Sequence, residues 1–590
     1  MEGGLIRVGH VEKGVVTADN LEGSKKKLMQ PNDKKLKGAA EILDVTGMQD
    51  IKARLLLEKE NLEGNGKGKE ILAGKEEKRA NETHTTQMSL EEEVVDEGLE
   101  KKKSRPKWKR WKSQARDINK KPSKAGTVVS KRLCSEVMWA NEMQLRIISK
   151  KIIKPSSPTP LHLKTHKLSL LDQLAPDIYT SLLFFYNGPS RVYDETNTST
   201  NNVYHRLQSS LSKTLNLYYP FAGKLLQDNY VVDCDDSGIP FVETRGPSSI
   251  SMSEVLKNPE MNTLQQLLPF NPNKKYLSST DDVNAAVQIN HFDCGGVAIG
   301  LNFRHIVADG AASVGFIQNW AKLHSSDDNS IINYKHTVVD CTDTFPPNQE
   351  ISSYARRINE WQRAPECVTK RFVFDGGKVA ALRGEIIKKD ASLSLNQYRP
   401  TRFEAVSGLI WDALIAMDRE ENVGSTCIAS VPVNLRNRMN PPLPEDCIGN
   451  LYHAVTCTAN KTSARNINQF TKMVSDDFVR KVYQDGGIVF VNQYKEAVEE
   501  IMKGDNGVRL FGFTGVIGLP FYEPDFGWGK PVWSTTAMSL NNIAVLLGTR
   551  DGKGVEAWVG LPINDMPKFE QDPGILTYAS FIPSRGAGFD

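Results

Sequence analysis

The sequence lacks the cysteine patterns that build zinc sites and disulfide frameworks. Its eight cysteines stand singly, with no C-x-x-C pair in the 590 residues. This distribution argues against zinc modules and against small folds held together by disulfides. We therefore expect no metal site and a reduced, cytoplasmic setting.

Long apolar runs are also missing. A helical membrane span needs about 18 to 20 mostly apolar residues, whereas apolar stretches such as 181–186 and 543–548 have the length of strands. The N-terminus has no apolar core of a secretory signal. The G-x-S-x-G elbow of serine hydrolases is absent as well. We expect no membrane partner and no serine nucleophile of that type.

The sequence also lacks a large excess of charge of one sign. The net charge is +3 and the isoelectric point about 8.2, which is too balanced to indicate nucleic acid or membrane. Residues 101–124 do carry twelve basic side chains and one acidic one, and Trp108 and Trp111 within them could stack on bases. The simpler interpretation is a solvated tail, so we do not expect a nucleic-acid partner.

The composition changes sharply near residue 143. Residues 1–142 are a low-complexity charged segment with few aromatics and little periodicity. Such a segment cannot bury enough apolar surface to offset the entropy lost on ordering. We expect a disordered N-terminal extension, either a natural tail or a gene-model artefact, and favour the artefact.

The rest of the chain mixes helical and strand patterns. Leu207, Leu211 and Leu215 recur at helical spacing, and Thr401 with Glu404 forms a capping-box pattern before an apolar helical stripe. Strands and helices mix throughout, which predicts an α/β class.

We expect two similar-sized domains. The N-terminal one takes residues 143–345 and the C-terminal one residues 373–590. A polar, proline-rich crossover at 346–372 separates them.

One histidine stands where a predicted strand ends. Residues 285–304 alternate as two strands around the turn 293–296, and a helical pattern begins after Gly310. His305 therefore leaves the second strand, where its side chain can enter a cleft, and Asp309 lies just before the helix. A histidine with a pKa near 6.5 suits a general base. Asp309 can cap the helix or pair with an arginine. From this stretch alone a purely structural histidine is the simpler interpretation.

A second stretch, DFGWG at 525–529, is by composition a structural turn between aromatic residues. Its glycines permit tight bends, and the Asp525 carboxylate can bind nearby N–H groups. Taken together, HxxxD at 305–309 and DFGWG resemble the BAHD family of plant acyl-CoA-dependent acyltransferases, closest in pattern to the vinorine-synthase-like alkaloid acetyltransferases. The resemblance spans about residues 143–590. Six further segments agree in order: LSLLDQLAP (168–176), YYPFAGKL (218–225), VDCDDSGIPFVE (232–243), TRFEAVSGLIW (401–411), VNLRNRMNPPLPEDCIGN (433–450) and TRDGKGVEAWVGL (549–561).

The resemblance implies two chloramphenicol-acetyltransferase-like domains with mixed sheets and a central solvent channel. It implies that His305 is the general base. Asp309 would be structural, holding the loop and orienting the histidine through an arginine, for which Arg436 is the candidate and Arg438 the weaker alternative. The motif Asp525, Phe526, Gly527, Trp528 and Gly529 would be structural and remote from the chemistry.

The chain departs from the family pattern in one informative place. Relatives often carry a Thr-Ser-Trp-x-Arg-like stretch before DFGWG, with the Thr and Trp placed to stabilise an oxyanion. Here Thr514 is retained as a candidate for that role, but Val516 stands in the tryptophan position and Gly518 in the arginine position. Arg304, next to the histidine, could narrow the acceptor channel or alter the environment of the histidine.

The implied activity is acyl-CoA-dependent O-acyl transfer, with acetyl-CoA as the expected co-substrate and no permanently bound cofactor. The expected acceptor is a hydroxyl of a plant specialised metabolite, an alkaloid among the candidates. N-acylation of an amine is the alternative within enzymes. A non-catalytic ligand-binding relative is the alternative outside them. The family also implies a monomer.

Overall fold

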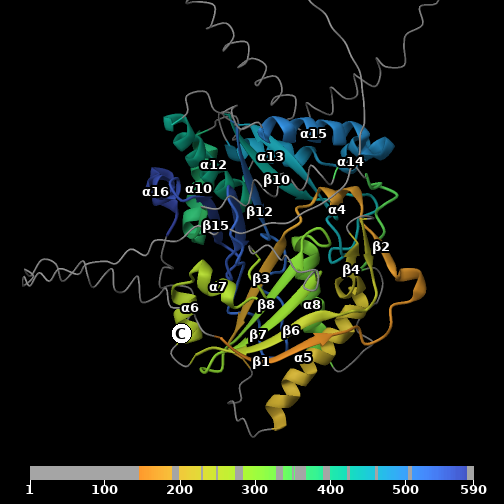
Figure 1. Ribbon diagram of the computed structural model, residues 1–590. Coiled ribbons are helices and arrows are strands. Elements are labelled where there is room, and N and C mark those ends of the chain that lie inside the picture. Colours follow the sequence, from red (N-terminus) through yellow and green to blue (C-terminus); the bar gives the residue numbers. More distant parts are fainter. Residues whose placement is uncertain are drawn as a thin grey trace, which may run out of the picture.

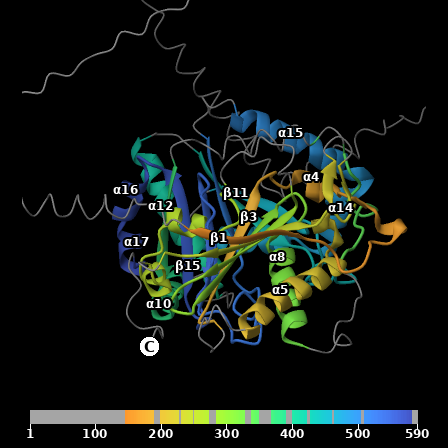
Figure 2. The same ribbon diagram turned by 60° about the horizontal axis from the view of Figure 1, so that its bottom comes forward.

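Two six-stranded mixed sheets organise the molecule in the computed structural model. The structure describes residues 145–188, 198–226, 230–247, 250–272, 283–326, 337–348, 351, 367–389, 399–421, 426–458, 463–502 and 508–580. The expectations for residues 1–142, and for the basic run 101–124 within them, lie outside these residues. Figures 1 and 2 show the sheets side by side, with helices packed against both.

The first sheet has the strand order β1-β6-β7-β8-β3-β13. Its strands are β1 (Arg146–Ile153), β3 (Tyr179–Tyr186), β6 (Ile239–Arg245), β7 (Ala285–His291), β8 (Val297–Arg304) and β13 (Trp533–Thr535). β7 and β8 pair antiparallel, and Gly295 in their turn has φ of +86°, a conformation that favours glycine. The hairpin predicted at 285–304 is therefore confirmed.

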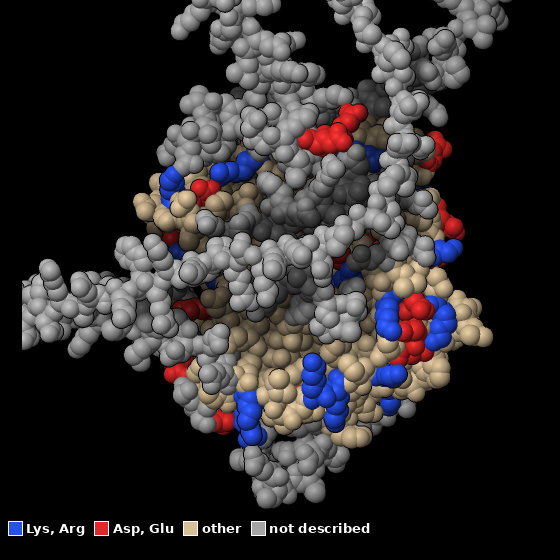
Figure 3. All heavy atoms as spheres, in the orientation of Figure 1, with Lys and Arg blue, Asp and Glu red and all other residues tan. Residues whose placement is uncertain are grey.

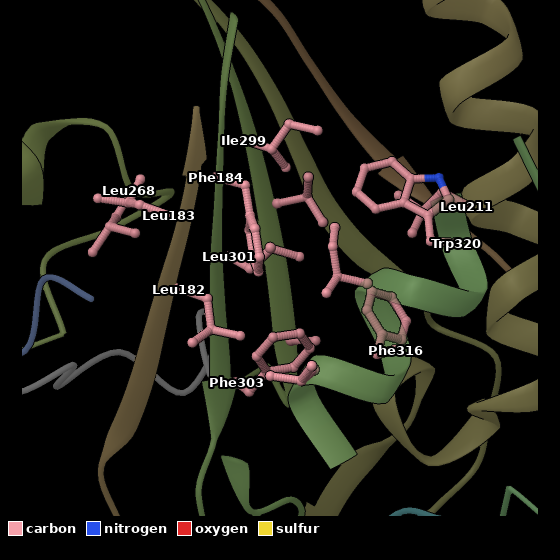
Figure 4. Close-up of a cluster of buried hydrophobic side chains, with 14 of the residues drawn as sticks. Leu182, Leu183, Phe184, Leu211, Leu268, Ile299, Leu301, Phe303, Phe316 and Trp320 are labelled. Atoms are coloured by element: carbon pink, nitrogen blue, oxygen red, sulfur yellow. The ribbon is translucent and has the colours of Figure 1, made fainter. Parts of the chain in front are cut away.

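Helices α5 (Thr198–Leu217) and α8 (Gly310–Ser325) pack against each other and cover one face of this sheet. Leu207, Leu211 and Leu215 are buried, as the four-residue spacing predicts. Figure 4 shows Leu211 of α5 with Phe316 and Trp320 of α8 facing the strand residues Ile299 and Phe303. The smaller elements of this half of the chain are α4 (Leu170–Leu174), α6 (Met252–Lys257), α7 (Met261–Gln266), η1 (Leu161–Leu163), η2 (Tyr219–Ala222), β2 (Thr165–Lys167), β4 (Lys224–Leu226) and β5 (Val231–Asp233).

The second sheet has the order β11-β10-β12-β14-β15-β9. Its strands are β9 (Cys367–Phe374), β10 (Thr426–Asn434), β11 (Tyr452–Thr458), β12 (Val508–Gly515), β14 (Ile543–Gly548) and β15 (Val555–Pro562). The helices of this half are α10 (Gly376–Lys389), α12 (Arg402–Glu421), α13 (Ser463–Met473), α14 (Asp476–Tyr483), η4 (Gln484–Gly487), α15 (Ile488–Met502), α16 (Met566–Gln571) and α17 (Pro573–Tyr578). The Thr401–Glu404 capping box forms at the start of α12.

The chain returns once from the second sheet to the first. β13 pairs with β3 at the edge of the first sheet, although its residues follow β12 of the second sheet in the chain. β9, in turn, begins the second sheet at Cys367, inside the stretch 346–372 that we expected to be only a crossover. Each sheet thus draws on residues beyond the sequence boundary expected for it, because hydrogen-bonded pairing decides membership. The domain division itself stays a prediction.

Candidate active site

His305 lies in the turn that follows β8, as the strand pattern predicts. Its backbone N–H donates to the carbonyl of Ile178 at 2.9 Å, and its side chain is half-buried. The Nδ1 atom of its imidazole lies 3.0 Å from Oδ1 of Asn450. The ring of Tyr452 stands edge-on, with 6.2 Å between the ring centroids.

The electrostatic setting of His305 favours a neutral imidazole. Burial lowers its pKa from the ordinary 6.5, and the nearby Asp309 and the Asn450 hydrogen bond oppose this only in part. A neutral ring is the form that can accept a proton. Unlike an exposed histidine, His305 therefore keeps this form somewhat below pH 6.5.

The Asp309 carboxylate bonds to groups on both sides of the turn. Its Oδ1 accepts from Ala312 N–H at 3.0 Å and so caps α8. Its carboxylate also forms a two-pronged ion pair with the guanidinium of Arg436, at 2.7 and 3.0 Å, and Oδ2 accepts from Leu451 N–H at 3.0 Å. With its carboxylate used in this way, Asp309 is turned toward the protein interior.

Arg436, and not Arg438, is the partner of Asp309. The Arg436 side chain is only 1% exposed and also donates to the carbonyl of Cys447 at 2.8 Å. Arg438 instead donates to the carbonyls of Thr471 and Val474. The predicted pair is thus present in the structure, and it ties the β8–α8 turn to the connection between β10 and β11.

Sequence reasoning missed two residues that hold the site together. Asn450 follows Gly449, whose carbonyl accepts from Asp309 N–H at 3.3 Å, and Asp172 in α4 accepts from Asn450 N–H at 2.7 Å. Both lie inside segments quoted for the family resemblance, LSLLDQLAP and VNLRNRMNPPLPEDCIGN. Because 278 positions separate them, no spacing rule could have paired them.

The DFGWG turn packs on the first sheet. Oδ1 of Asp525 accepts from Gly527 N–H at 2.8 Å and from Gly529 N–H at 3.0 Å. The Phe526 ring forms a T-shaped pair with Trp320 of α8, with 5.0 Å between the ring centroids. It forms a second T-shaped pair with Tyr186 of β3, with 5.9 Å between the ring centroids. The motif therefore closes on itself and on a buried aromatic cluster, as a structural turn does.

Thr514 and Val516 lie where the second sheet approaches α8. Thr514 is near the end of β12 and pairs with Val545 of β14. Val516 is 8% exposed, and its Cγ1 lies 3.5 Å from the position that a Cβ on Gly310 would take. The residue in the family's tryptophan position thus packs against the first residue of α8. A role of Thr514 in stabilising an oxyanion stays a prediction.

Arg304, next to the candidate base, forms an internal ion pair. Its guanidinium pairs with Asp177 through Nε at 2.9 Å and Nη2 at 3.1 Å, and its side chain is 4% exposed. A side chain held in this way is used in an internal ion pair. A role of Arg304 in narrowing the acceptor channel or altering the environment of the histidine stays a prediction.

Known proteins match most of this chain. The model of the Transferase family, the BAHD acyltransferases, matches residues 143–576. The chain belongs to this family. A limonoid 1-O-acetyltransferase of Citrus sinensis is 41% identical over 460 residues, covering 75% of this chain and all of the relative. Stemmadenine O-acetyltransferase of Catharanthus roseus is 33% identical over 444 residues, covering 73% and 97%.

A solved structure of another protein has the same fold as this BAHD chain. The crystal structure of vinorine synthase is 29% identical and superposes with a TM-score of 0.59, covering 74% of this chain and 99% of that one. The chain is an acyl-CoA-dependent acyltransferase with an α/β fold of two sheet-containing parts, as expected from its motifs. Among the described residues, no helix is long and apolar enough to cross a membrane, and no cluster of three or more His, Cys, Asp or Glu could hold a metal.

Proposed function

We propose that this BAHD enzyme transfers an acetyl group from acetyl-CoA to a hydroxyl of a polycyclic plant metabolite. A limonoid-type alcohol is the first candidate acceptor and an alkaloid alcohol the second. The observation that carries the chemistry is the His305 imidazole, whose Nδ1 is engaged by Asn450 while Nε2 is left to take a proton. The acceptor order follows the relatives, named for limonoids at 41% identity and for an alkaloid at 33%.

The transfer is direct and needs no covalent enzyme intermediate. Nε2 of His305 takes the hydroxyl proton while the acceptor oxygen attacks the thioester carbonyl carbon, which forms the new C–O bond and a tetrahedral oxyanion. Collapse of this intermediate breaks the C–S bond, and the CoA thiolate takes the proton back from Nε2. The products are the acetyl ester and free CoA, with the histidine regenerated. Such a base contributes about 10²- to 10⁴-fold to the rate.

We place the two substrates in a channel between the two sheets, with His305 reachable from both ends, as the family resemblance implies. The arrangement of the turn supports this placement, since His305 leaves the first sheet at the point where Asn450 and Tyr452 of the second half meet it. The cytoplasmic location, the monomeric state and the absence of a resident cofactor remain predictions from the sequence.

The decisive experiment measures CoA release. Purified full-length protein is incubated with acetyl-CoA and, separately, a limonoid alcohol, an indole-alkaloid alcohol and a primary amine. Free thiol and acetylated product are then quantified. We expect ester formation with the wild type and a fall of about 10²-fold or more in kcat for His305→Ala. Because burial lowers the pKa of His305, the acid limb of kcat/KM should lie below pH 6.5.

The same experiment separates the alternatives. Amide formation without ester formation would assign N-acylation. Equal rates of CoA release by wild type and His305→Ala would overturn the catalytic interpretation. Binding of acetyl-CoA with no turnover of any acceptor would favour a ligand-binding relative, the alternative raised by Val516 in the tryptophan position.

A further inference from the structure

A buried amide from the second half of the chain connects the candidate base to a carboxylate of the first half. Nδ2 of Asn450 donates to Oδ1 of Asp172 at 3.0 Å and to the backbone carbonyl of His305 at 2.7 Å. Both amide hydrogens are thus used on atoms that only accept. A flipped amide would set its oxygen against these two acceptors, so the orientation of the Asn450 side chain is determined.

This orientation determines where the imidazole carries its proton. Oδ1 of Asn450 lies 3.0 Å from Nδ1 of His305, and an amide oxygen can only accept. Nδ1 must therefore donate. In the neutral ring Nε2 is then unprotonated, which is the state that a base requires. Burial, which favours the neutral ring by lowering its pKa, acts in the same direction.

The Asp172 carboxylate accepts four hydrogen bonds, which fix its orientation. Its Oδ2 accepts from the backbone N–H and the hydroxyl of Ser169 at 2.9 and 2.7 Å, in the capping box of α4. Its Oδ1 accepts from the backbone and side chain of Asn450 at 2.7 and 3.0 Å. The residue is 5% exposed. Because these hydrogen bonds fix the Asp172 carboxylate, the carboxylate in turn fixes the Asn450 amide that donates to it.

We propose that Asp172 is a positioning residue for the transfer reaction: through Asn450 it keeps the His305 proton on Nδ1 and leaves Nε2 to receive the proton of the acceptor. This inference rests on the proposed role of His305 as the base. Asp172 precedes β3 of the first sheet, whereas Asn450 precedes β11 of the second. The proton-accepting state of His305 therefore depends on contact between the two halves.

The first test needs neither a substrate nor a loss of function. Full-length protein labelled with ¹⁵N at histidine is measured by NMR at pH 7.5, and the His305 ring signals are identified by their absence in His305→Gln. We expect a proton on Nδ1 and none on Nε2. A ring protonated on Nε2, or an even mixture of the two tautomers, would overturn the proposal whether or not the protein transfers acetyl groups. A missing transferase activity would instead count against the proposed function.

The second test is kinetic, with acetyl-CoA and a limonoid alcohol as substrates. Asn450→Leu removes the amide at similar volume, and Asp172→Asn removes the charge that orients it. We expect kcat to fall by about 10- to 1000-fold in each, since a wrong histidine tautomer is costly to a base, with KM for acetyl-CoA changed less than about twofold. If Asp172 acts through Asn450, the double variant should be no slower than Asn450→Leu alone.

A matched control separates positioning from general damage. Asp236 also accepts several bonds, from Thr159 and Lys164, and its φ of +60° is one that asparagine tolerates. Asp236→Asn should keep the kcat of the wild type and the Nδ1 tautomer. Independent, multiplicative losses in the double variant, or an unchanged tautomer in Asp172→Asn and Asn450→Leu, would overturn the proposal. If either variant fails to fold, the tautomer of the wild type still decides.

Discussion

At the scale of single residues, the candidate base differs from the groups that hold its turn in how its polar atoms are used. His305 keeps a half-buried ring with one nitrogen engaged, whereas both oxygens of Asp309 are used on Arg436, Ala312 and Leu451. A carboxylate in that state cannot also relay a proton. The HxxxD spacing therefore reflects the geometry of a strand–turn–helix, with the histidine at its open end and the aspartate as the helix cap.

The ion pair of Asp309 and Arg436 should be costly to break from one side. Asp309→Ala leaves a guanidinium that is 1% exposed without its charge partner, and such a loss destabilises a protein by about 3–5 kcal/mol. Urea denaturation measures the free energy of unfolding. Glu523→Ala, which removes the exposed partner of Lys530, serves as the control and should behave like the wild type. A stability of Asp309→Ala equal to that of the control would contradict the buried-pair argument.

Thr514 is the remaining candidate for oxyanion support. If its hydroxyl donates to the tetrahedral intermediate, Thr514→Val should lower kcat by about 10²- to 10³-fold at a nearly unchanged KM for acetyl-CoA. Thr514→Ser keeps the hydroxyl and should stay close to the wild type. Steady-state kinetics of the two variants decide the matter, because equal rates for both would assign the oxyanion to another donor.

At the scale of elements, short turns rather than long helices position the candidate site and the DFGWG motif. The DFGWG turn is held by one carboxylate oxygen that accepts from two backbone N–H groups. Gly527 and Gly529 have φ of +85° and +98°, where a side chain is strained. The turn also carries the chain from β12 of the second sheet to β13 of the first.

Asp525 is expected to act through this turn and not through proton transfer. Asp525→Ala removes both hydrogen bonds and should lower the free energy of unfolding by about 1–3 kcal/mol, while the acid limb of the pH–rate profile stays in place. Asp525→Asn retains an accepting oxygen and should lose less. Urea denaturation together with pH-dependent kinetics checks this expectation. A displaced acid limb with normal stability would assign Asp525 to the chemistry instead.

At the scale of the whole molecule, the two halves are interlocked and the surface is mixed in charge. β13 sits in the first sheet, and the Arg436–Asp309 and Asn450–Asp172 contacts join the two halves at the site. The face in Figure 3 carries basic and acidic side chains interspersed among uncharged ones. Buried contacts that cross between the sheets make the described part of the chain one folded unit.

Acid should destabilise this unit before its carboxylates titrate. Burial lowers the pKa of His291 to about 3 and those of His324 and His453 to about 4. As the pH falls below 6.5 the unfolded chain binds protons at these positions and the folded chain does not, so stability is lost. Each histidine contributes up to about 1.4 kcal/mol per pH unit.

Urea denaturation at pH 7.5, 6.5 and 5.5 measures this slope. His453→Gln removes one of the three groups and should reduce the loss of stability between pH 6.5 and 5.5 relative to the wild type. A free energy of unfolding that is constant or rises over that interval would contradict the argument.

Much of the local structure follows from the sequence because short-range physics decides it. Alternation and a glycine turn predict the 285–304 hairpin, the four-residue leucine spacing predicts the buried face of α5, and Thr401 with Glu404 predicts the start of α12. Spacing and a family pattern likewise single out His305, Asp309 and the DFGWG turn. All of these depend on residues close together in the chain.

Only the tertiary structure decides which distant residues meet. The placement of β13 in the first sheet, the choice of Arg436 over Arg438 and the Asp172–Asn450–His305 connection depend on contacts across more than 100 positions. The ion pair of Arg304 with Asp177 is another contact of this kind. Hydrogen-bond partners are chosen by burial and geometry in three dimensions. The sequence can therefore propose His305 as the base, whereas only the fold places Nδ1 of its ring beside Oδ1 of Asn450.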